Sequence, residues 1–314
     1  MKFIEAFHES DNIKGIYLVK QKTSAVTKAG KPYDNIILQD RTGTIEGKIW
    51  DPNSAGIEDF EALDYVEINA LVKEFNSALQ LSVSRVRKAR EGEYYPEDYL
   101  PVSEKNIDTM YEELISYIDS VKNPYLNRLC SSFFKDDEGF ADRFKRSSAA
   151  KSVHHGFIGG LLEHTLSVTR LCEFYCKAYP LLKRDLLLSV AMLHDIGKIK
   201  ELSDFPLNDY TDDGQLLGHI VMGSEMIAEK IKAIDGFPER LASEVKHCIL
   251  AHHGEYEFGS PKKPALMEAM ALNFADNTDA KMETFTEQLK SAASTGWLGF
   301  NKLLESNIRK TGDI

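Results

Sequence analysis

Metal-binding side chains recur in a simple order between residues 164 and 276 of this sequence. The order is a histidine, a His-Asp pair, a histidine, a His-His pair and an aspartate, and each comes from a separate segment. Neutral imidazole and carboxylate groups bind divalent cations, whereas an unpaired polar group on an apolar helix face is costly. A fold that satisfies the whole series must gather distant segments around one interior site. The members are His164, His194, Asp195, His219, His252, His253 and Asp276.

The His194-Asp195 pair ends an apolar run in the segment AMLHDIGK. Adjacent residues on a helix point about 100° apart, so a metal site must lie where both side chains reach it. Gly197, two residues after Asp195, predicts that the helix stops there. Six or seven ligands exceed what one ion needs, so we expect two ions with the oxygens of Asp195 bridging them. Ligands from separate helices predict a helical bundle with an interior site.

The chain turns helical from Ser103 onward. Asn123-Pro124 is typical of a helix start. We expect a helical domain over residues 107–300 and a disordered polar tail over 301–314. The expected helices cover residues 103–121, 123 onward, 161–179, 184–194, 220–233, 240–252 and 265–293.

The first ninety residues read instead as strands. Apolar residues alternate with polar ones at 66–72 and 79–84, and turn signals lie at 28–31, 40–43 and 76–77. Five strands with a short helix at 54–61 predict a small barrel of the oligonucleotide-binding (OB) kind over residues 1–92. The acidic, proline-containing stretch that follows predicts a linker over 93–106.

Basic and aromatic residues on the predicted barrel strands suggest a surface for single-stranded nucleic acid. The candidates are Lys48, Trp50, Phe75, Arg85 and Arg87, a mixture that can stack bases and screen phosphates. The alternative is structural: Trp50 lies in the barrel core and Arg85-Val86-Arg87 form a solvated edge strand.

The net charge argues against sequence-blind coating of DNA but does not exclude binding of a strand in a local groove. The chain carries -11 overall, yet residues 1–92 have 13 Lys+Arg against 14 Asp+Glu.

No apolar stretch approaches the roughly 20 residues of a membrane helix. Four cysteines without a Cys-x-x-Cys pair are expected to be reduced, mostly buried thiols, and we expect a cytoplasmic protein. The cysteines are Cys130, Cys172, Cys176 and Cys248.

The ordered series resembles the HD phosphohydrolase superfamily over roughly residues 150–285. Segments at 154–165 (HHGFIGGLLEHT), 252–264 (HHGEYEFGSPKKP) and 275–281 (ADNTDAK), behind an OB-like domain, are similar to the bacterial 3′→5′ exoribonucleases of the YhaM type. The resemblance implies a multidomain chain: an N-terminal all-β OB-fold barrel followed by an all-α HD-superfamily domain.

The resemblance also implies roles for individual residues. One ion would be held by His164, His194, Asp195 and Asp276, and the other by Asp195, His219, His252 and His253. Asp195 and Lys198 would be catalytic, with Lys198 neutralising charge on the phosphoryl group; the alternative for Lys198 is a surface lysine. His154 and His155 are candidate substrate contacts or, alternatively, capping or core residues. Asp279 is an alternative ligand to Asp276.

The resemblance implies a hydrolase, a metal-dependent 3′→5′ exoribonuclease that shortens single-stranded RNA and releases 5′-mononucleotides, with DNA as a further candidate substrate. The expected cofactors are two divalent ions, manganese first, with iron, cobalt, magnesium and zinc as alternatives. A second hypothesis is a phosphohydrolase of small nucleotides with a regulatory OB domain. A third is a binding protein whose metal site is structural. The oligomeric state stays open.

Overall fold

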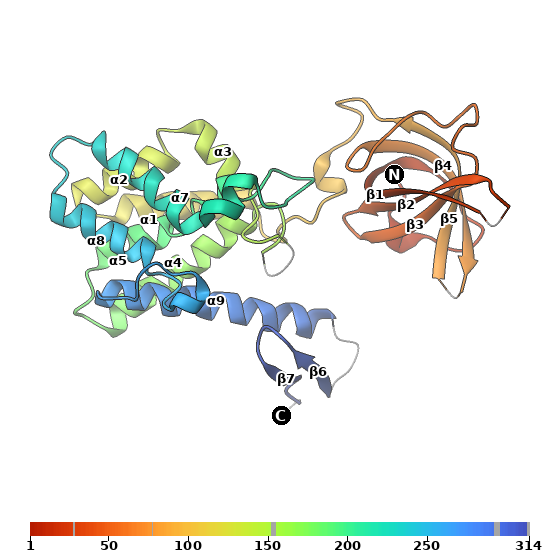
Figure 1. Ribbon diagram of the computed structural model, residues 1–314. Helices are drawn as coiled ribbons and strands as arrows, with labels where there is room; N and C mark the ends of the chain where they lie inside the picture. Colours follow the sequence, from red (N-terminus) through yellow and green to blue (C-terminus); the bar gives the residue numbers. More distant parts are fainter. Residues whose placement is uncertain (28, 77, 152–154, 292–295, 313–314) are drawn as a thin grey trace. The chain divides into compact units, whose positions relative to one another are not determined.

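The structure is a computed structural model that describes residues 1–314 except 28, 77, 152–154, 292–295 and 313–314. It divides into two compact units, Met1–Val102 and Ser103–Ile314 (Figure 1). Among the described residues, no helix combines the length and apolar character that a membrane crossing requires.

The first unit is a closed five-stranded barrel with the strand order β1-β2-β3-β5-β4 (Figure 1). The β3–β5 pairing is parallel and the other neighbours are antiparallel. A register shift between Val19 and Gln21 lets the long strand β1 bend between its partners β2 and β4. This topology confirms the predicted OB-type barrel. The strands are β1 (Asn12–Val26), β2 (Pro32–Asp40), β3 (Gly43–Ile49), β4 (Tyr65–Phe75) and β5 (Ala78–Lys88).

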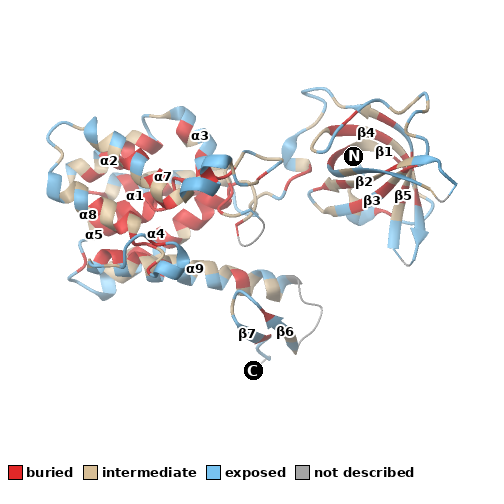
Figure 2. Cartoon of the chain, in the orientation of Figure 1, coloured by how far each residue is buried: buried red, intermediate tan, exposed pale blue. Residues whose placement is uncertain are grey.

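Alternating side chains fill the barrel. Along β2, Ile36 and Leu38 are fully buried and separated by a half-buried residue, which is the period that a strand with one covered face requires. Figure 2 shows the same alternation of buried and exposed positions along the strands. A 3-10 turn at Ile4–Ala6 precedes the barrel.

The short helix expected at residues 54–61 is wrong, because this segment forms turns. Its backbone pairs with β5 instead: Val86 N donates to Gly56 O at 2.9 Å, and Glu58 N donates to Val86 O at 2.9 Å. Pro52 and Gly56 disfavour a helix, and these bonds to β5 satisfy the loop backbone without one.

Residues 93–102 differ from the predicted linker because they pack on the barrel. Tyr99 and Leu100 are buried, and Gln39 Nε2 donates to Tyr99 O at 3.0 Å. The ring of Tyr94 stacks on Tyr65 with centroids 3.9 Å apart. The first unit therefore extends to Val102, and a 3-10 turn at Pro96–Asp98 lies within this added segment.

The second unit is helical, as predicted, and its helices enclose one large apolar core (Figure 2). Asn106 and Asn123 cap the first two helices: the Asn106 side chain accepts from Thr109 N, and Pro124 begins the second helix. The helices are α1 (Ile107–Ser120), α2 (Pro124–Phe134), α3 (Glu138–Arg146), α4 (Gly160–Ala178), α5 (Arg184–Leu193), α6 (Lys198–Glu201), α7 (Asp212–Lys232), α8 (Glu239–Leu250) and α9 (Met267–Ser291), with a 3-10 turn at Tyr256–Phe258.

Helix α7 begins earlier than predicted because it is two helical pieces joined at a kink. Gly218 has φ of 74°, a left-handed conformation that glycine adopts without a Cβ clash. The kink interrupts the apolar period, so the sequence pattern predicts only the second piece. It places His219 at the start of that piece.

The C-terminal region is a β-hairpin rather than the predicted disordered tail. Strands β6 (Trp297–Asn301) and β7 (Ser306–Arg309) pair antiparallel. Ile308 is only 1% exposed, so burial of this side chain helps order a segment that reads as polar in sequence.

Candidate metal centre

The predicted ligands converge from five places in the helical unit. His164 lies in α4, His194 and Asp195 directly follow α5, and His219 lies just after the kink of α7. The His-His pair follows α8, and Asp276 lies in α9. The helices therefore bring together side chains that are more than 100 positions apart in sequence.

Asp195 lies at the centre of this group and is 1% exposed. Its Oδ2 is 3.4 Å from His164 Nε2 and 3.3 Å from His194 Nε2. Its Oδ1 is 3.5 Å from His219 Nε2 and 3.7 Å from His252 Nε2. The two oxygens of one carboxylate thus face two different sets of imidazoles.

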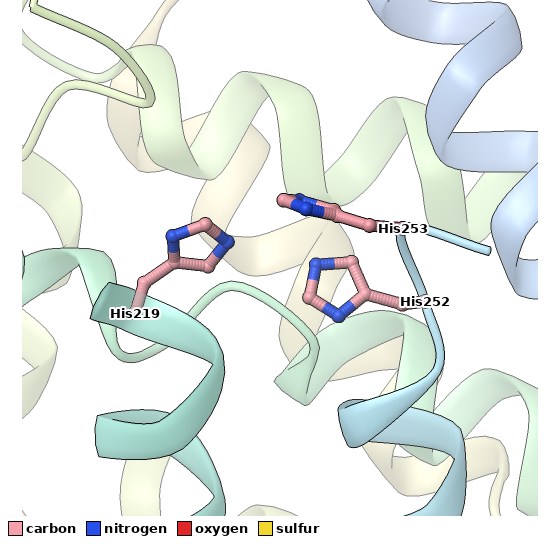
Figure 3. A group of neighbouring side chains, drawn as sticks. All are labelled: His219, His252 and His253. Carbon is pink, nitrogen blue, oxygen red and sulfur yellow. The ribbon is translucent and has the colours of Figure 1, made fainter. Parts of the chain in front are cut away.

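Among the described residues, three sets of three side chains have ligand atoms close enough to hold one ion, and two of these sets lie on the two sides of Asp195; the third consists of His155, His164 and Asp279. Of the two sets beside Asp195, one contains His164, His194 and Asp276, and the other contains the three histidines drawn in Figure 3. In Figure 3, His219 comes from α7 and its ring faces the rings of His252 and His253. In each set the ligand atoms lie within 4.8 Å of one another. This grouping coincides with the division that the sequence resemblance implies.

Buried polar atoms at the centre lack hydrogen-bond partners. They are both oxygens of Asp195 and the Nε2 atoms of His219 and His252. Lys198 Nζ lies 2.7 Å from Asp195 Oδ2, but this one cation does not satisfy the set. Since uncompensated buried polar groups are costly, the residues present fit bound cations.

Hydrogen bonds at the opposite ring nitrogen orient the imidazoles. In His194 and His252, Nδ1 lies 2.8 and 2.7 Å from the carbonyl oxygen three residues earlier. In His253, Nδ1 lies 2.7 Å from Phe258 O. A carbonyl only accepts, so each Nδ1 carries the proton and each Nε2 offers its lone pair to the centre.

Glu201 anchors His219 and was missed by the sequence reasoning. Its Oε1 lies 2.9 Å from His219 Nδ1 and accepts the His219 backbone N–H, also at 2.9 Å. Glu201 is buried at the end of α6. In the sequence, the only indication of this role is that Glu201 lies three residues after Lys198. The indication is weak, because acidic residues are common on helix surfaces.

We expect Glu201→Ala to weaken manganese binding about 10- to 100-fold, because such outer anchors fix ligand orientation and basicity. The measurement is calorimetric titration of the metal-stripped protein. Glu201→Gln keeps an acceptor oxygen and should lose less, whereas Glu225→Ala on the exposed face of α7 should bind as the parent does. Unchanged affinity in Glu201→Ala would contradict the anchoring role.

The structure separates the two candidate aspartates of α9. Asp276 Oδ1 lies 3.2 Å from His164 Nε2, on the side of the predicted ion. Asp279 Oδ2 lies 2.7 Å from His164 Nδ1 and 3.1 Å from His155 Nε2, behind the ring. The geometry favours Asp276 as the ligand and Asp279 as the group that orients His164.

Of the two predicted substrate contacts, His154 and His155, the structure describes only His155. His154 lies outside the described residues. His155 is 1% exposed and contacts Asp279, so the structure places it behind the ligands rather than on a surface that substrate can reach. Burial against a carboxylate is the physical reason for this correction.

Local charges set the protonation of the centre. Burial lowers the pKa of His252 and of His253, which favours the neutral, ligating imidazole. Burial opposes ionisation of Asp195, but Lys198 and His194 hold its pKa well below the ordinary value. For His164, the carboxylates of Asp195 and Asp276 outweigh burial and raise the pKa well above the ordinary value.

The predicted contacts on the barrel fall into two kinds. Trp50 is 53% exposed beside Tyr33, and Arg85 is exposed as well, so neither is in the core. Lys48 Nζ instead donates to Asn35 and Glu46, each at 2.8 Å.

Arg87 is likewise engaged within the barrel unit, by Glu67 and Glu93, each 2.8 Å from its guanidinium. These carboxylates raise the pKa of Arg87. Arg87 and Lys48 would have to break existing ion pairs to bind phosphate, whereas Trp50 and Arg85 would not.

The cysteines behave as core residues. Cys130, Cys172 and Cys248 are buried, as predicted, and Cys176 is half-buried. Burial raises the pKa of Cys130 to about 12, which keeps this thiol protonated and unreactive.

The helical bundle and its His/Asp centre define an HD domain, and the family model "HD domain" matches residues 161–281. Three curated relatives are each named 3′-5′ exoribonuclease YhaM. The protein of Bacillus velezensis is 37% identical over 88% of this chain and 87% of its own length. Those of Geobacillus sp. and Bacillus subtilis are both 34% identical, over 92% and 90% of this chain and 88% and 90% of their own lengths.

The chain belongs to the family of these YhaM 3′-5′ exoribonucleases. The resemblance drawn from the sequence motifs is thereby confirmed, as is the combination of an OB-type barrel with an HD domain.

Proposed function

We propose that this protein is a metal-dependent 3′→5′ exoribonuclease that shortens single-stranded RNA and releases 5′-mononucleotides. Membership of the YhaM family supports the reaction and its polarity. The position of Asp195, with one oxygen toward each set of imidazoles, supports chemistry at two cations. That position is the observation on which the proposal rests most heavily.

The two cations would be held by the sets that share Asp195. Bound there, they would supply Lewis-acid activation of a water molecule and compensation of phosphate charge. In the hydrolysis a water oxygen bonds to phosphorus and the bond from phosphorus to the 3′ oxygen breaks. The shortened strand keeps a 3′-hydroxyl and the nucleotide leaves with a 5′-phosphate.

The chain's own residues would position these groups. The Nδ1 hydrogen bonds hold the Nε2 lone pairs toward the centre before any ligand arrives, which lowers the cost of ordering the site. Lys198, half-buried and 2.7 Å from Asp195 Oδ2, would place a positive charge beside the reacting phosphate. Asp195, His194 and His252 are almost fully buried, which limits water around the reacting atoms.

The barrel would hold the strand that the helical unit trims. Trp50 offers an exposed ring for a base and Arg85 an exposed guanidinium for a phosphate. An OB barrel is suited to single strands because an unpaired base can splay out and stack.

The test is incubation of a 5′-labelled single-stranded RNA with the purified protein and manganese, resolved on a sequencing gel. We expect a ladder that shortens from the 3′ end, 5′-mononucleotides as product, and complete inhibition by a chelator. The same gel with single-stranded DNA measures the requirement for the 2′-hydroxyl. Release of free phosphate from nucleoside monophosphates, with RNA left intact, would overturn the proposal in favour of a small-nucleotide phosphohydrolase.

A further inference from the structure

The C-terminal hairpin carries an aromatic surface that the metal centre does not use. Strands β6 and β7 pair from Trp297–Arg309 to Asn301–Ser306, and Lys310 N donates to Gly296 O at 3.1 Å beyond the last pair. In Figure 1 the hairpin lies at the end of α9 that extends away from the other helices. Helix α9 itself continues about 18 Å past Asp279 before it ends.

The two faces of this hairpin differ sharply. Residues paired across antiparallel strands share a face, and neighbours along a strand alternate. Ile308 and Asn301 lie on one face and are 1% and 8% exposed, so protein covers part of that face, although Ser306 on it is exposed. Phe300, opposite Asn307, lies on the other face, and a register shift between Trp297 and Gly299 places Trp297, opposite Arg309, on that face as well.

The outer face exposes large aromatic surface at a basic position. Trp297 is 68% exposed and Phe300 is 63% exposed, although aromatic rings of this size gain much from burial. Residues 296–312 carry three basic side chains against one acidic residue, Glu305, in a chain of net charge -11. The basic residues are Lys302, Arg309 and Lys310.

We propose that this outer face binds single-stranded RNA, with bases stacked on Trp297 and Phe300 and a phosphate at Arg309. The proposal rests on the proposed function, since it assigns a second contact for the same substrate. Aromatic rings beside cations are the combination that holds single strands without sequence preference, because every base has a π face. The local positive charge favours an RNA backbone over an apolar protein surface.

The position of the hairpin predicts which part of the RNA it contacts. Because α9 extends well past Asp279, the hairpin engages nucleotides upstream of the 3′ end that enters the metal centre. Its contribution should therefore appear only with RNA long enough to reach both places.

The first test uses tryptophan fluorescence, because the chain contains two tryptophans, Trp50 and Trp297. Trp50→Phe leaves Trp297 as the only tryptophan. Titration of this manganese-loaded variant with an oligouridylate whose 3′-terminal linkages are cleavage-resistant phosphorothioates should give saturable quenching of its fluorescence. Fluorescence that does not change over a range in which a labelled oligonucleotide binds would overturn the proposal.

The second test measures how kcat/KM depends on RNA length. In the parent protein we expect kcat/KM to rise from a dinucleotide to an oligonucleotide of about 20 residues, and Trp297→Ala/Phe300→Ala should reduce that rise at least about tenfold. Phe174→Ala, which removes a ring that is 62% exposed on α4, is the matched control and should keep the rise. Circular dichroism of each variant checks that the fold is intact.

Salt dependence separates charge from stacking. Arg309→Gln should reduce the slope of log affinity against log salt by about 0.7, the value for one phosphate contact to a single strand. An unchanged rise with RNA length in the double alanine variant, together with a shift in its oligomeric state, would overturn the proposal and identify the face as a protein contact. If the parent protein cleaves no RNA, the proposed function fails, while the fluorescence titration still tests RNA binding by the hairpin.

Discussion

Replacing Asp195 with asparagine should abolish RNA hydrolysis, with a loss of at least about a thousandfold in kcat/KM, or about 4 kcal/mol. Asp195 has one oxygen toward each imidazole set. Asparagine keeps the shape but loses one oxygen and the charge, so it cannot serve two cations. Activity on labelled RNA and metal content by elemental analysis are the measurements.

The matched control is Asp235→Asn, which removes one negative charge from an exposed position of the same unit and should leave both measurements unchanged. Asp195→Asn also leaves the half-buried Lys198 ammonium without its carboxylate, so its melting temperature must be reported beside its activity. A folded Asp195→Asn protein that retains two metal equivalents and normal turnover would refute the shared-carboxylate arrangement.

Gly197→Ala should both destabilise the helical unit and inactivate the centre. A Cβ at Gly197 would lie 2.1 Å from the carbonyl oxygen of His219 and 2.7 Å from the backbone nitrogen of Gly223. Neither backbone atom can yield without separating α6 from α7, and that movement takes His219 away from Asp195. We expect a loss of at least about 3 kcal/mol in the free energy of unfolding, measured by urea denaturation.

Gly139 in α3 provides the control because its surroundings are open. The nearest atom to a Cβ there is Asp137 Oδ1, at 3.8 Å. Alanine has the higher helix propensity, so Gly139→Ala should gain up to about 1 kcal/mol. Equal stability of the two alanine variants would show that the close approach of α7 to Gly197 does not constrain the protein.

Gly197 also illustrates the limit of sequence reasoning at this site. Its place after the His-Asp pair predicts a helix terminus, and α5 does end at Leu193. The residue itself has ordinary right-handed backbone angles, φ of -63° and ψ of -23°, which do not require glycine. Its reason for being glycine is the tertiary contact with α7, which no local pattern contains.

The candidate metal ligands could be predicted from the sequence, whereas the residues that orient those ligands could not. A series of histidines and aspartates on apolar helices is conspicuous because burial makes it costly, and the structure brings the whole series together. Glu201, by contrast, acts only through the fold, since it meets His219 across a loop of ten residues between α6 and α7. The C-terminal hairpin was not predicted for a related reason. Its strands contain one buried isoleucine, and a single buried apolar residue gives no periodic pattern in the sequence.

The shared carboxylate has a thermodynamic consequence for how the centre fills. In the proposed two-cation arrangement, a cation on one side of Asp195 would withdraw electron density from the oxygen that the other side needs, and two like charges would repel at short range. The two binding equilibria would thus be coupled, and the penalty would be the same whichever side loads first. Metal titrations should resolve two stepwise constants, the second weaker, so that the doubly loaded protein accumulates only when the ion is abundant.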